Sequence, residues 1–368
     1  MLYSSGIGTY ISHVLLGLVE RMPQINFELL LHPNLVDTER GKKLLNNQHV
    51  SKILLNAEIY TIAEQIEIYH KINNSQLYWS PHYNVPLFLK KPLMRLVTIH
   101  DVYHLAYKHE LSLAKKIYAK VLMQKAVKSE KIITVSNFSK DEIVKYTHCD
   151  PSKIDVIYNG IESTAAISSQ ANKTKVTTGN PLLKEQYIIY VGNVKPHKNL
   201  TLLIDSFAQL KNDKRYEDLR LVIIGKKEGF ITGDAELFQK IESMPQLKNE
   251  LFFTGWIEDD ELKAFYANAQ LLVFPSVYEG FGLPPLEAMS MQCPVASSNA
   301  ACMQEINGKA ALYFDPTSVT QLSEAISSIL QDAALKQKLL EAGKDRSQQF
   351  TWEKSIEAHE KLIASMIK

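Results

Sequence analysis

The chain has 368 residues, 45% of them hydrophobic and 22% charged, which suits two folded α/β domains. Its 41 Lys and Arg balance 40 Asp and Glu, and the formal net charge of +1 argues against a dedicated nucleic-acid-binding protein. The three cysteines form no CxxC motif and cannot all pair. The sequence therefore predicts a reducing compartment, without a disulfide framework or a cysteine-based metal site.

The chain begins with a glycine segment, Ser5-Gly6-Ile7-Gly8. A Rossmann-like domain normally starts with a strand that feeds such a turn, yet only Met1-Leu2-Tyr3 precedes Ser4. We expect the first strand to be absent or to lie upstream of Met1, and an upstream extension to increase stability and activity. No apolar run approaches the roughly 20 residues of a membrane span, and the N-terminus lacks the features of a secretory signal. A cytoplasmic location follows, with any membrane contact peripheral.

Short apolar runs alternate with helical patterns along the rest of the chain, which predicts parallel sheets covered on both faces. Helices are expected over 112–128 and 200–210. The predicted strands lie in the ranges 93–101, 130–137, 153–160, 187–192, 219–225, 251–255 and 269–276. Residues 163–181 are rich in Ser, Thr, Ala and Asn and show no periodicity, so they predict a linker between domains at 1–162 and 182–351.

The strongest functional signal is PSVYEGFGLPPLEAM at 275–289, which follows a predicted strand and leads into a helix expected at about Pro285. Its glycines, Gly280 and Gly282, let the backbone approach a ligand, and a helix N-terminus favours anions. Glu279 and Glu287 suit sugar hydroxyls better than phosphate. A plain glycine turn with two solvated carboxylates is the alternative, but both Glu and the double Pro at this spacing favour a binding site.

The EGFGLPPLE segment resembles the Glu-x7-Glu signature of retaining family 4 glycosyltransferases, which have the two-domain GT-B fold. Further matches occur in the family's order at 5–10 (SGIGTY), 98–101 (TIHD), 135–142 (VSNFSKDE), 156–161 (VIYNGI), 190–200 (YVGNVKPHKNL), 253–257 (FTGWI) and 350–355 (FTWEKS). The resemblance implies an α/β protein with two Rossmann-like domains, whose parallel sheets face across a donor-binding cleft. It also implies that a C-terminal helix, 352–368, joins the N-terminal domain.

Carried over by position, Glu279 would hold the donor sugar's hydroxyls, and Glu287 would accept hydrogen bonds from the nucleotide ribose. The backbone amides of Phe281, Gly282 and Leu283 would lie against the sugar and diphosphate. The resemblance implies no resident cofactor and no metal, and no sequence cluster has convincing metal-ligand spacing.

The segment GNVKPHKN at 192–199 follows a predicted strand and precedes a helix. Lys198 matches the family's diphosphate-binding lysine, and a fixed cation there stabilises the departing diphosphate. The family's usual arginine is replaced by Asn193, and Lys195 is the nearest basic residue. Solvated lysines are the alternative, which the helix dipole disfavours at a helix start.

Two further elements are assigned to the donor by the resemblance. His100 follows a strand at its carboxyl end and would orient the donor, while Gly6 and Gly8 would form a loop facing the diphosphate. Weaker candidates for base and phosphate contacts are Gly225, Lys226, Lys227, Trp256 and Ile257. His82, His104 and His109 are expected to be ordinary surface or core residues.

These features predict a retaining hexosyltransferase of bacterial surface-polysaccharide assembly, with GDP-mannose as the first donor candidate and a UDP-hexose as the second. The acceptor would be a saccharide or a lipid-linked saccharide. An inactive homologue acting as a partner subunit is the alternative suggested by Asn193 and the absent strand. A nicotinamide oxidoreductase is less well supported, because no third glycine follows Gly8.

Residues 108–131 contain seven Lys and two Glu, with apolar residues interleaved at helical spacing. A solvated basic face of a domain helix is the favoured interpretation. Contact with a phosphate-bearing lipid acceptor or an anionic membrane leaflet is the functional alternative.

Overall fold

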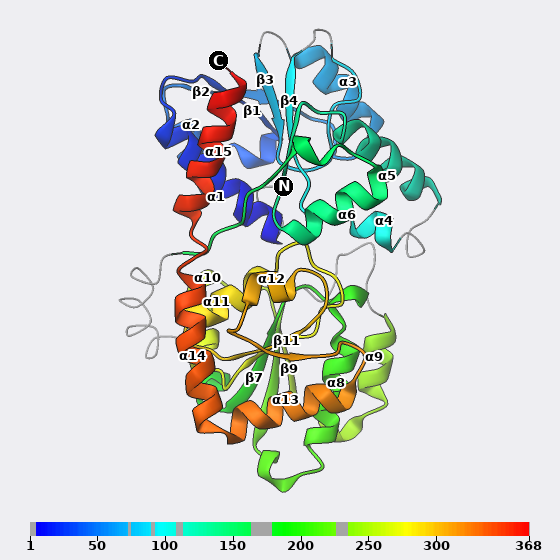
Figure 1. Ribbon diagram of the computed structural model, residues 1–368, viewed down its shortest axis with the longest axis vertical. Coiled ribbons are helices and arrows are strands. Elements are labelled where there is room, and N and C mark those ends of the chain that lie inside the picture. The colour runs from blue at the N-terminus through cyan, green and yellow to red at the C-terminus, as the bar shows by residue number, and fades with distance from the viewer. Residues whose placement is uncertain are drawn as a thin grey trace. The chain divides into compact units, whose positions relative to one another are not determined.

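The computed structural model describes residues 5–72, 75–89, 93–107, 113–162, 179–225 and 235–367 (Figure 1). The chain divides into two compact units: unit 1 is Met1–Gly160 with Trp352–Lys368, and unit 2 is Ile161–Thr351. The sequence predicted a first domain that ends at 162 and is joined by residues 352–368. Of the expected linker, 163–178 lies outside the described residues, and Pro181 begins a short 3-10 helix, η4 (Pro181–Lys184).

Unit 1 holds six parallel strands in two sheets. One sheet pairs β1 (Phe27–Leu31) with β2 (Val50–Leu54). The other has the order β3 (Leu77–Ser80), β4 (Met94–Thr98), β5 (Lys131–Thr134) and β6 (Ile154–Val156). The helices are α1 (Ser5–Arg21), α2 (Glu39–Leu45), α3 (Ile62–Lys71), α4 (Tyr103–Ala106), α5 (Leu113–Ala126), α6 (Asn137–Thr147) and α15 (Trp352–Met366).

Unit 2 holds one six-stranded parallel sheet in the order β12-β11-β10-β7-β8-β9. The strands are β7 (Gln186–Val191), β8 (Leu219–Ile224), β9 (Leu251–Gly255), β10 (Leu272–Phe274), β11 (Val295–Ser298) and β12 (Leu312–Phe314). The helices are α8 (Leu200–Leu210), α9 (Ala235–Glu242), α10 (Asp259–Asn268), α11 (Leu283–Ser290), α12 (Met303–Asn307), α13 (Val319–Gln331) and α14 (Ala333–Ser347). The strand order reverses between β7 and β10, so the loops after these strands border the crevice where such sheets bind ligands.

The helix predicted over 200–210 is confirmed as α8, and the one over 112–128 corresponds to α5. The glycine turn expected at Gly6 and Gly8 is wrong, since both residues lie in the first turns of α1. Neither glycine has a positive φ, so the segment simply continues as helix, and Ser12 Oγ donates to the Gly8 carbonyl at 2.8 Å. The absent first strand stays a prediction, because residues 1–4 lie outside the described residues.

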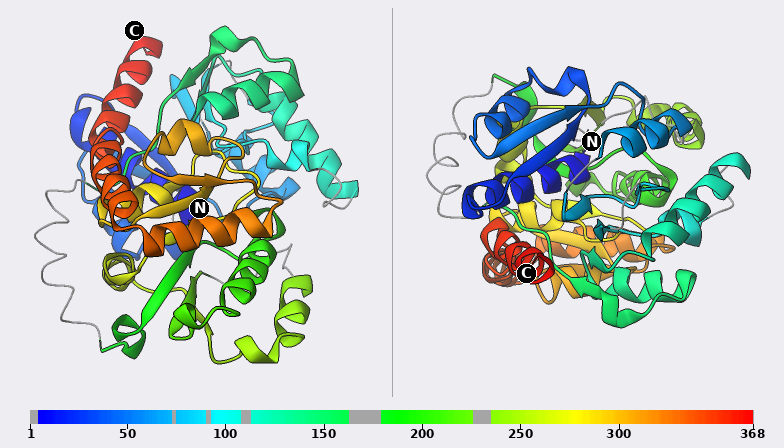
Figure 2. Two further views of the ribbon diagram at one scale, coloured as in Figure 1. Left: turned by 60° about the horizontal axis from the view of Figure 1, so that its bottom comes forward. Right: turned by 90° about the horizontal axis from the view of Figure 1, so that it is seen from above.

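The last helix packs into unit 1 against the first, and Figures 1 and 2 show the red α15 alongside the blue α1. Close approach is possible because Gly17 has no side chain: a Cβ there would lie 2.4 Å from Ile356 Cδ1. Tyr10 hydroxyl lies 2.7 Å from His359 Nε2 and 3.0 Å from Thr98 Oγ1, which ties both helices to β4. Burial lowers the pKa of His359 to about 4, so this buried imidazole is neutral.

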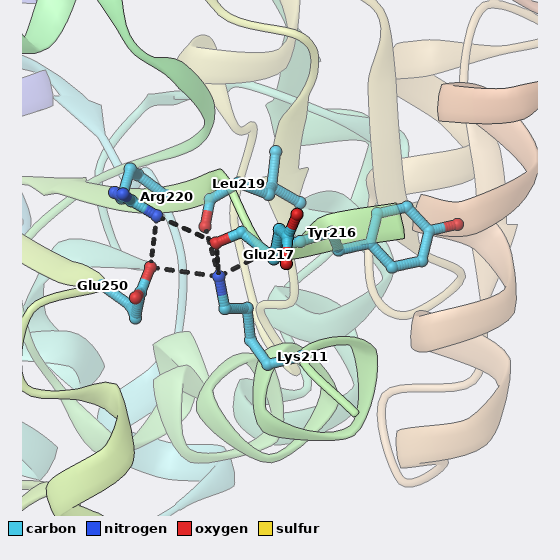
Figure 3. Close-up of polar contacts among 6 residues, drawn as sticks. All are labelled: Lys211, Tyr216, Glu217, Leu219, Arg220 and Glu250. Carbon is cyan, nitrogen blue, oxygen red and sulfur yellow. Dashed lines mark hydrogen bonds and ion pairs between the residues drawn. The ribbon is translucent and has the colours of Figure 1, made fainter. Parts of the chain in front are cut away.

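A cluster of polar contacts around Lys211 lies at the end of the unit 2 sheet where β8 and β9 begin (Figure 3). Lys211, just after α8, donates its ammonium to the carbonyls of Tyr216, Glu217 and Leu219 at 2.9, 2.6 and 3.1 Å. It also pairs with Glu250 at 3.0 Å, and Arg220 reaches the same carboxylate at 2.5 Å. The cluster joins the end of α8 to the starts of β8 and β9, at the opposite edge from the ligand side.

Within the described residues, we find no helix that combines the length and the apolar character needed to cross a membrane.

Candidate active site

Glycines end two central strands of unit 2 and open the ligand side of its sheet. Gly192 follows β7 with φ +153°, and Gly225 follows β8 with φ +149°. A Cβ on Gly225 would lie 2.0 Å from the Gly192 carbonyl oxygen, so no other residue fits there without moving the backbone. The loops after β7 and β8 therefore lie against each other at the carboxyl ends of these strands.

Lys198 and Glu279 form a mostly buried ion pair, with 2.5 Å between Nζ and Oε1. Lys198 comes from a short 3-10 helix, η5 (Pro196–Lys198), after β7, and Glu279 comes from the loop after β10. The two residues are far apart in the sequence but lie on the two loops that border the switch point. A cation and a carboxylate thus share one site, where they suit a diphosphate and sugar hydroxyls respectively.

Asn199 and His197 fix the position of the Glu279 loop from the β7 side. Asn199 has φ +57° and donates its side-chain amide to the carbonyls of Pro275 and Pro316, at 3.2 and 2.8 Å. The backbone N–H of Val277 donates to the His197 carbonyl at 2.9 Å. Burial, and then the positive charges of the neighbouring lysines, lower the pKa of His197 to about 3, so its ring is neutral.

A buried cysteine supports the same loop from its other side. The Cys302 thiol lies 3.2 Å from the Glu279 carbonyl and 3.3 Å from the Phe281 carbonyl, and donates to both. Burial raises the pKa of this thiol, so it stays protonated and remains a donor. The Phe281 ring meets Phe350 edge-on at 5.8 Å, which anchors the loop in the core of unit 2.

Gly282 makes the turn into α11 and has φ +84°. A Cβ there would lie 2.7 Å from Met303 Cε. The helix begins at Leu283, earlier than the predicted start at about Pro285. Pro284 and Pro285 carry no N–H, so this helix start offers an anion fewer backbone donors than an ordinary one.

Glu287 lies half-buried on α11, and its carboxylate accepts a hydrogen bond from the Tyr266 hydroxyl at 2.9 Å. Burial raises the pKa of Glu287 to about 7, while the tyrosine hydrogen bond lowers it and the Asp259 and Glu162 charges raise it. A carboxylate held in this way has an oxygen left to accept from a ligand hydroxyl.

The remaining predicted donor residues of unit 2 lie on the loop after β7. The Asn193 carbonyl accepts from the Tyr190 hydroxyl at 3.2 Å, which fixes the loop by its backbone. Lys195 caps η5 with an extended backbone, and its charge helps to lower the pKa of His197. Lys195 is therefore close to the Lys198 site.

His100 lies in unit 1, directly after β4, as predicted. Its Nε2 is 3.0 Å from the Pro81 carbonyl, and its ring meets Tyr10 of α1 edge-on at 4.8 Å. Burial lowers the pKa of the His100 imidazole. The α1 helix that carries Gly6 and Gly8 thus supplies a direct contact to His100 through Tyr10.

The structure adds little support for the weaker candidates for base and phosphate contacts. Trp256 is 63% exposed, and Lys226 and Lys227 lie outside the described residues. His82 is buried against Tyr83 and His100, and burial lowers its pKa to about 3, as for a core histidine. His104 stacks on Tyr83, and His109 lies outside the described residues. In the described ranges no group of three or more His, Cys, Asp or Glu is placed to hold a metal ion.

Three supporting residues were not identified from the sequence: Asn199, Tyr266 and Cys302. An Asn directly before a helix is a weak signal for a left-handed backbone. Tyr266 and Cys302 gave no such signal, because their roles depend on contacts that only the folded chain creates.

Two Rossmann-like units built on parallel sheets, with a cation and a carboxylate paired at the switch point of the second, have the architecture of the GT-B class of glycosyltransferases. The family model for glycosyl transferases group 1 matches residues 173–346, and that for glycosyltransferase family 4 matches residues 59–164. The chain belongs to this glycosyltransferase family.

Known relatives agree with the assignment. The chain is 31% identical over 277 residues to the O-antigen chain mannosyltransferase RfbU of Salmonella typhimurium, covering 74% of this chain and 70% of the relative. It is 30% identical over 278 residues to the O-antigen chain mannosyltransferase B of Escherichia coli, covering 75% and 71%. The crystal structure of Anabaena Alr3699/HepE in complex with UDP-glucose has the same fold, with a TM-score of 0.74, 16% identity, and coverage of 99% of this chain and 97% of that chain.

Proposed function

We propose that this glycosyltransferase transfers a hexose, with retention and without a metal ion, from a nucleotide sugar to a saccharide or lipid-linked saccharide acceptor of the cell surface. The observation that carries the proposal is the Lys198–Glu279 pair at the switch point of the unit 2 sheet. It supplies a fixed cation for a departing diphosphate and a carboxylate for sugar hydroxyls.

GDP-mannose is the proposed first donor, because both relatives named above are O-antigen chain mannosyltransferases. A UDP-hexose is the second, supported by the UDP-glucose bound to the Anabaena protein of the same fold. The proposal includes a cytoplasmic location, supported by three buried free cysteines, as expected in a reducing compartment.

Each residue has a definite part in the proposed reaction. The bond between the sugar's anomeric carbon and the phosphate oxygen breaks, and the acceptor oxygen bonds to the same face of that carbon. The acceptor's proton passes to the leaving phosphate oxygen, so no side chain has to act as nucleophile. Lys198 stabilises the negative charge on the leaving group, Glu279 accepts from the sugar hydroxyls, and Glu287 accepts from the ribose.

The test is a transfer and donor-hydrolysis assay with a panel of nucleotide sugars, with and without a metal chelator. We expect turnover with GDP-mannose that survives chelation, and loss of turnover in Glu279→Ala. Lys198→Ala should lower the rate by about 10²–10³-fold, as expected for removing one preorganised transition-state donor. The exposed Lys309 of the same unit provides a matched control, since Lys309→Ala removes a positive charge away from this pair.

The outcomes separate the alternatives. No turnover with any donor, in a folded protein that still binds nucleotide, would favour the inactive partner subunit over the enzyme. Near-native turnover in Glu279→Ala would refute its assigned role, and strict dependence on Mg²⁺ or Mn²⁺ would refute the metal-free mechanism.

A further inference from the structure

Four polar side chains are joined by hydrogen bonds inside unit 1. The Tyr10 hydroxyl of α1 lies at their centre, 2.7 Å from His359 Nε2 of α15 and 3.0 Å from Thr98 Oγ1 of β4. The Trp79 indole N–H of β3 donates to the same Thr98 oxygen at 3.1 Å. Tyr10, Thr98 and His359 are fully buried. We call Tyr10, Trp79, Thr98 and His359 the Tyr10 network.

The direction of each hydrogen bond in this network follows from its two ends. His359 Nδ1 lies 2.7 Å from the Ser355 carbonyl, which only accepts, so Nδ1 carries a proton. Burial lowers the pKa of His359 to about 4, so the ring is neutral and its Nε2 accepts from the Tyr10 hydroxyl. The Tyr10 oxygen then accepts from the Thr98 hydroxyl, which in turn accepts from the Trp79 indole. The protons of the network therefore have one arrangement.

The Tyr10 network replaces what could be an apolar part of the core. Burial of hydroxyl, indole and imidazole groups costs desolvation free energy, and the hydrogen bonds among them mainly offset that cost. Apolar side chains of similar size would fill this space without it. What the polar groups add is a fixed position for the Tyr10 ring, because directional partners hold its hydroxyl from both sides.

The two helices of the network are also held together at their surface. Arg21 of α1 pairs with Glu353 and Glu360 of α15, at 2.5 and 2.6 Å. These ion pairs lie near the two ends of α15, on either side of His359 in the sequence or next to it. The position of His359 relative to Tyr10 is therefore set by the whole contact between the helices.

The Tyr10 ring contacts His100, the residue predicted to orient the donor. The ring centroids are 4.8 Å apart and the planes meet at 87°, an edge-to-face arrangement that aromatic rings favour. His100 Nε2 lies 3.0 Å from the Pro81 carbonyl and therefore carries the proton. Burial lowers the pKa of His100, so the ring is neutral and Nδ1 is an acceptor. Within the described part of the chain, no hydrogen bond is made to this Nδ1.

The backbone of His100 is fixed by other elements. Its carbonyl accepts from the Ser139 hydroxyl of α6 at 3.0 Å, and the preceding Ile99 N–H donates to the Ile133 carbonyl of β5 at 2.8 Å. The main chain at His100 thus depends on β5 and α6. The orientation of its ring depends instead on the Pro81 carbonyl and the Tyr10 ring.

We propose that Tyr10 and His359 are positioning residues for His100, and that they hold its imidazole with Nδ1 available to a hydroxyl of the donor sugar. The inference rests on the proposed function and on the orienting role expected of His100. It gives α15 a part in turnover besides its part in the core of unit 1. A ring that is misplaced by a fraction of an ångström no longer orients its ligand, and the reaction slows.

The first test compares kcat with nucleotide affinity, using GDP-mannose and GDP, or a UDP-hexose and UDP if the donor panel selects them. Tyr10→Phe removes the hydroxyl and keeps the ring, and His359→Leu removes the acceptor. Each should lower kcat about tenfold, while the Kd of the nucleoside diphosphate stays unchanged because its predicted binding residues lie in unit 2. His359→Gln, which offers an acceptor oxygen in place of Nε2, should restore most of the rate.

A double-mutant cycle separates positioning from a general effect on the fold. In a His100→Ala background, Tyr10→Phe and His359→Leu should cause no further loss of kcat, because the residue through which they act is absent. Thr147→Val is the matched control. It removes another buried hydroxyl of unit 1, one that donates to the Ile143 carbonyl at 2.6 Å, and should leave kcat unchanged.

Nitrogen-15 NMR of the imidazoles tests the positioning without any turnover. The His100 signals, identified by their loss in His100→Ala, should show a single tautomer with the proton on Nε2 in the wild type. Tyr10→Phe and His359→Leu should show a mixture of tautomers, because the ring is no longer held against the Pro81 carbonyl.

Three results would overturn the inference: the wild-type tautomer in both variants, equal rate losses with and without His100, or a wild-type kcat in His100→Ala. Absence of turnover with every donor would instead refute the proposed enzyme. In that case the NMR spectra still decide the inference, since mixed tautomers support the positioning of His100 and unchanged ones contradict it.

Discussion

Glu279 and Glu287 belong to one sequence motif, yet their surroundings give them different chemistry. Glu279 meets the Lys198 ammonium at 2.5 Å, whereas Glu287 is half-buried and accepts from the Tyr266 phenol at 2.9 Å. Removal of the Glu287 carboxylate from water favours its protonated form and raises its pKa to about 7. At the scale of single residues, the protonation of Glu287 therefore changes near neutral pH.

Glu287 should make the stability of the free protein fall as pH rises from about 4.5 to 7. Its pKa is raised from 4.5 to about 7 in the folded chain, so the folded state holds this proton more tightly than the unfolded state does. The contribution is complete below the unfolded pKa and is lost as pH rises through 7, about 3 kcal/mol at most. Melting of wild type and Glu287→Gln at pH 5.5 and pH 8 measures it.

We expect the wild type to lose stability relative to Glu287→Gln at the higher pH. A difference between the two proteins that is the same at both pH values would contradict the raised pKa.

Tyr266 should act as a positioning residue for Glu287. Tyr266→Phe removes a hydrogen bond to the carboxylate, so the Glu287 pKa should rise further and donor binding should require a higher pH. A titration of nucleotide-sugar affinity against pH should show its midpoint shifted upward. Tyr187→Phe is the control, since it removes another buried hydroxyl, one that donates to the Phe265 carbonyl at 2.8 Å. A uniform loss of affinity at every pH would indicate only a packing defect.

The sequence pointed to Glu279 and Glu287 but not to the residues that support their loop and helix in the fold. The spacing within 275–289 led directly to Glu279 and Glu287, because both belong to one local motif. Asn199, Tyr266 and Cys302 act on this motif from other elements, so no local spacing contains the information. The helix α11 begins at Leu283 and not at about Pro285 as predicted, because both prolines are accepted in the first turn of a helix, where they supply no N–H.

At the scale of elements, the cluster around Lys211 explains how α8 is joined to the sheet (Figure 3). One ammonium satisfies three backbone carbonyls at the start of β8 and neutralises part of the Glu250 charge. Because this edge is opposite the glycine loops, the cluster affects stability and leaves the ligand side unchanged.

Lys211→Met should therefore destabilise the protein by roughly 2–4 kcal/mol, since several charge-assisted hydrogen bonds are lost together. The donor KM should not change. Chemical denaturation with a parallel kinetic assay measures both quantities. Lys214→Met, three residues away in η6 (Lys214–Tyr216), is the control, and a comparable loss in this variant would contradict the role of the cluster.

Some strands of mixed composition were not predicted, among them β2 and β11. β2 (VSKIL) contains only exposed and half-buried residues, and β11 (VASS) is fully buried although half of it is serine. The serines are satisfied by the fold: Ser298 Oγ donates to the Ser276 carbonyl at 2.6 Å. Such strands depend on tertiary partners, so periodicity alone does not reveal them.

At the scale of the whole molecule, the chain crosses between its units twice, near residues 160 and 351. The crossings meet: the Ile161 N–H donates to the Phe350 carbonyl at 3.0 Å, and Ile161 bridges Thr351. The composition of residues 163–181 predicted the first crossing. The second was predicted only from the family resemblance, since nothing in the sequence of α15 indicates which core it completes.

The contact between α1 and α15 should decide the stability of unit 1. Gly17→Leu places a side chain where Ile356 already lies, 2.4 Å from the position of a Cβ, and overpacking of this kind costs about 1–3 kcal/mol or more. Hydrogen exchange should increase in β4 and β5 of unit 1 but not in β7 and β8 of unit 2. Gly6→Ala is the control, because no atom lies within 4 Å of a Cβ at Gly6 on the same helix.

Ile356→Ala should partly rescue Gly17→Leu by making room for the leucine, so that the double variant is less destabilised than the sum of the single variants. Additive losses, or faster exchange in both units alike, would show that α15 does not stabilise unit 1 through this contact.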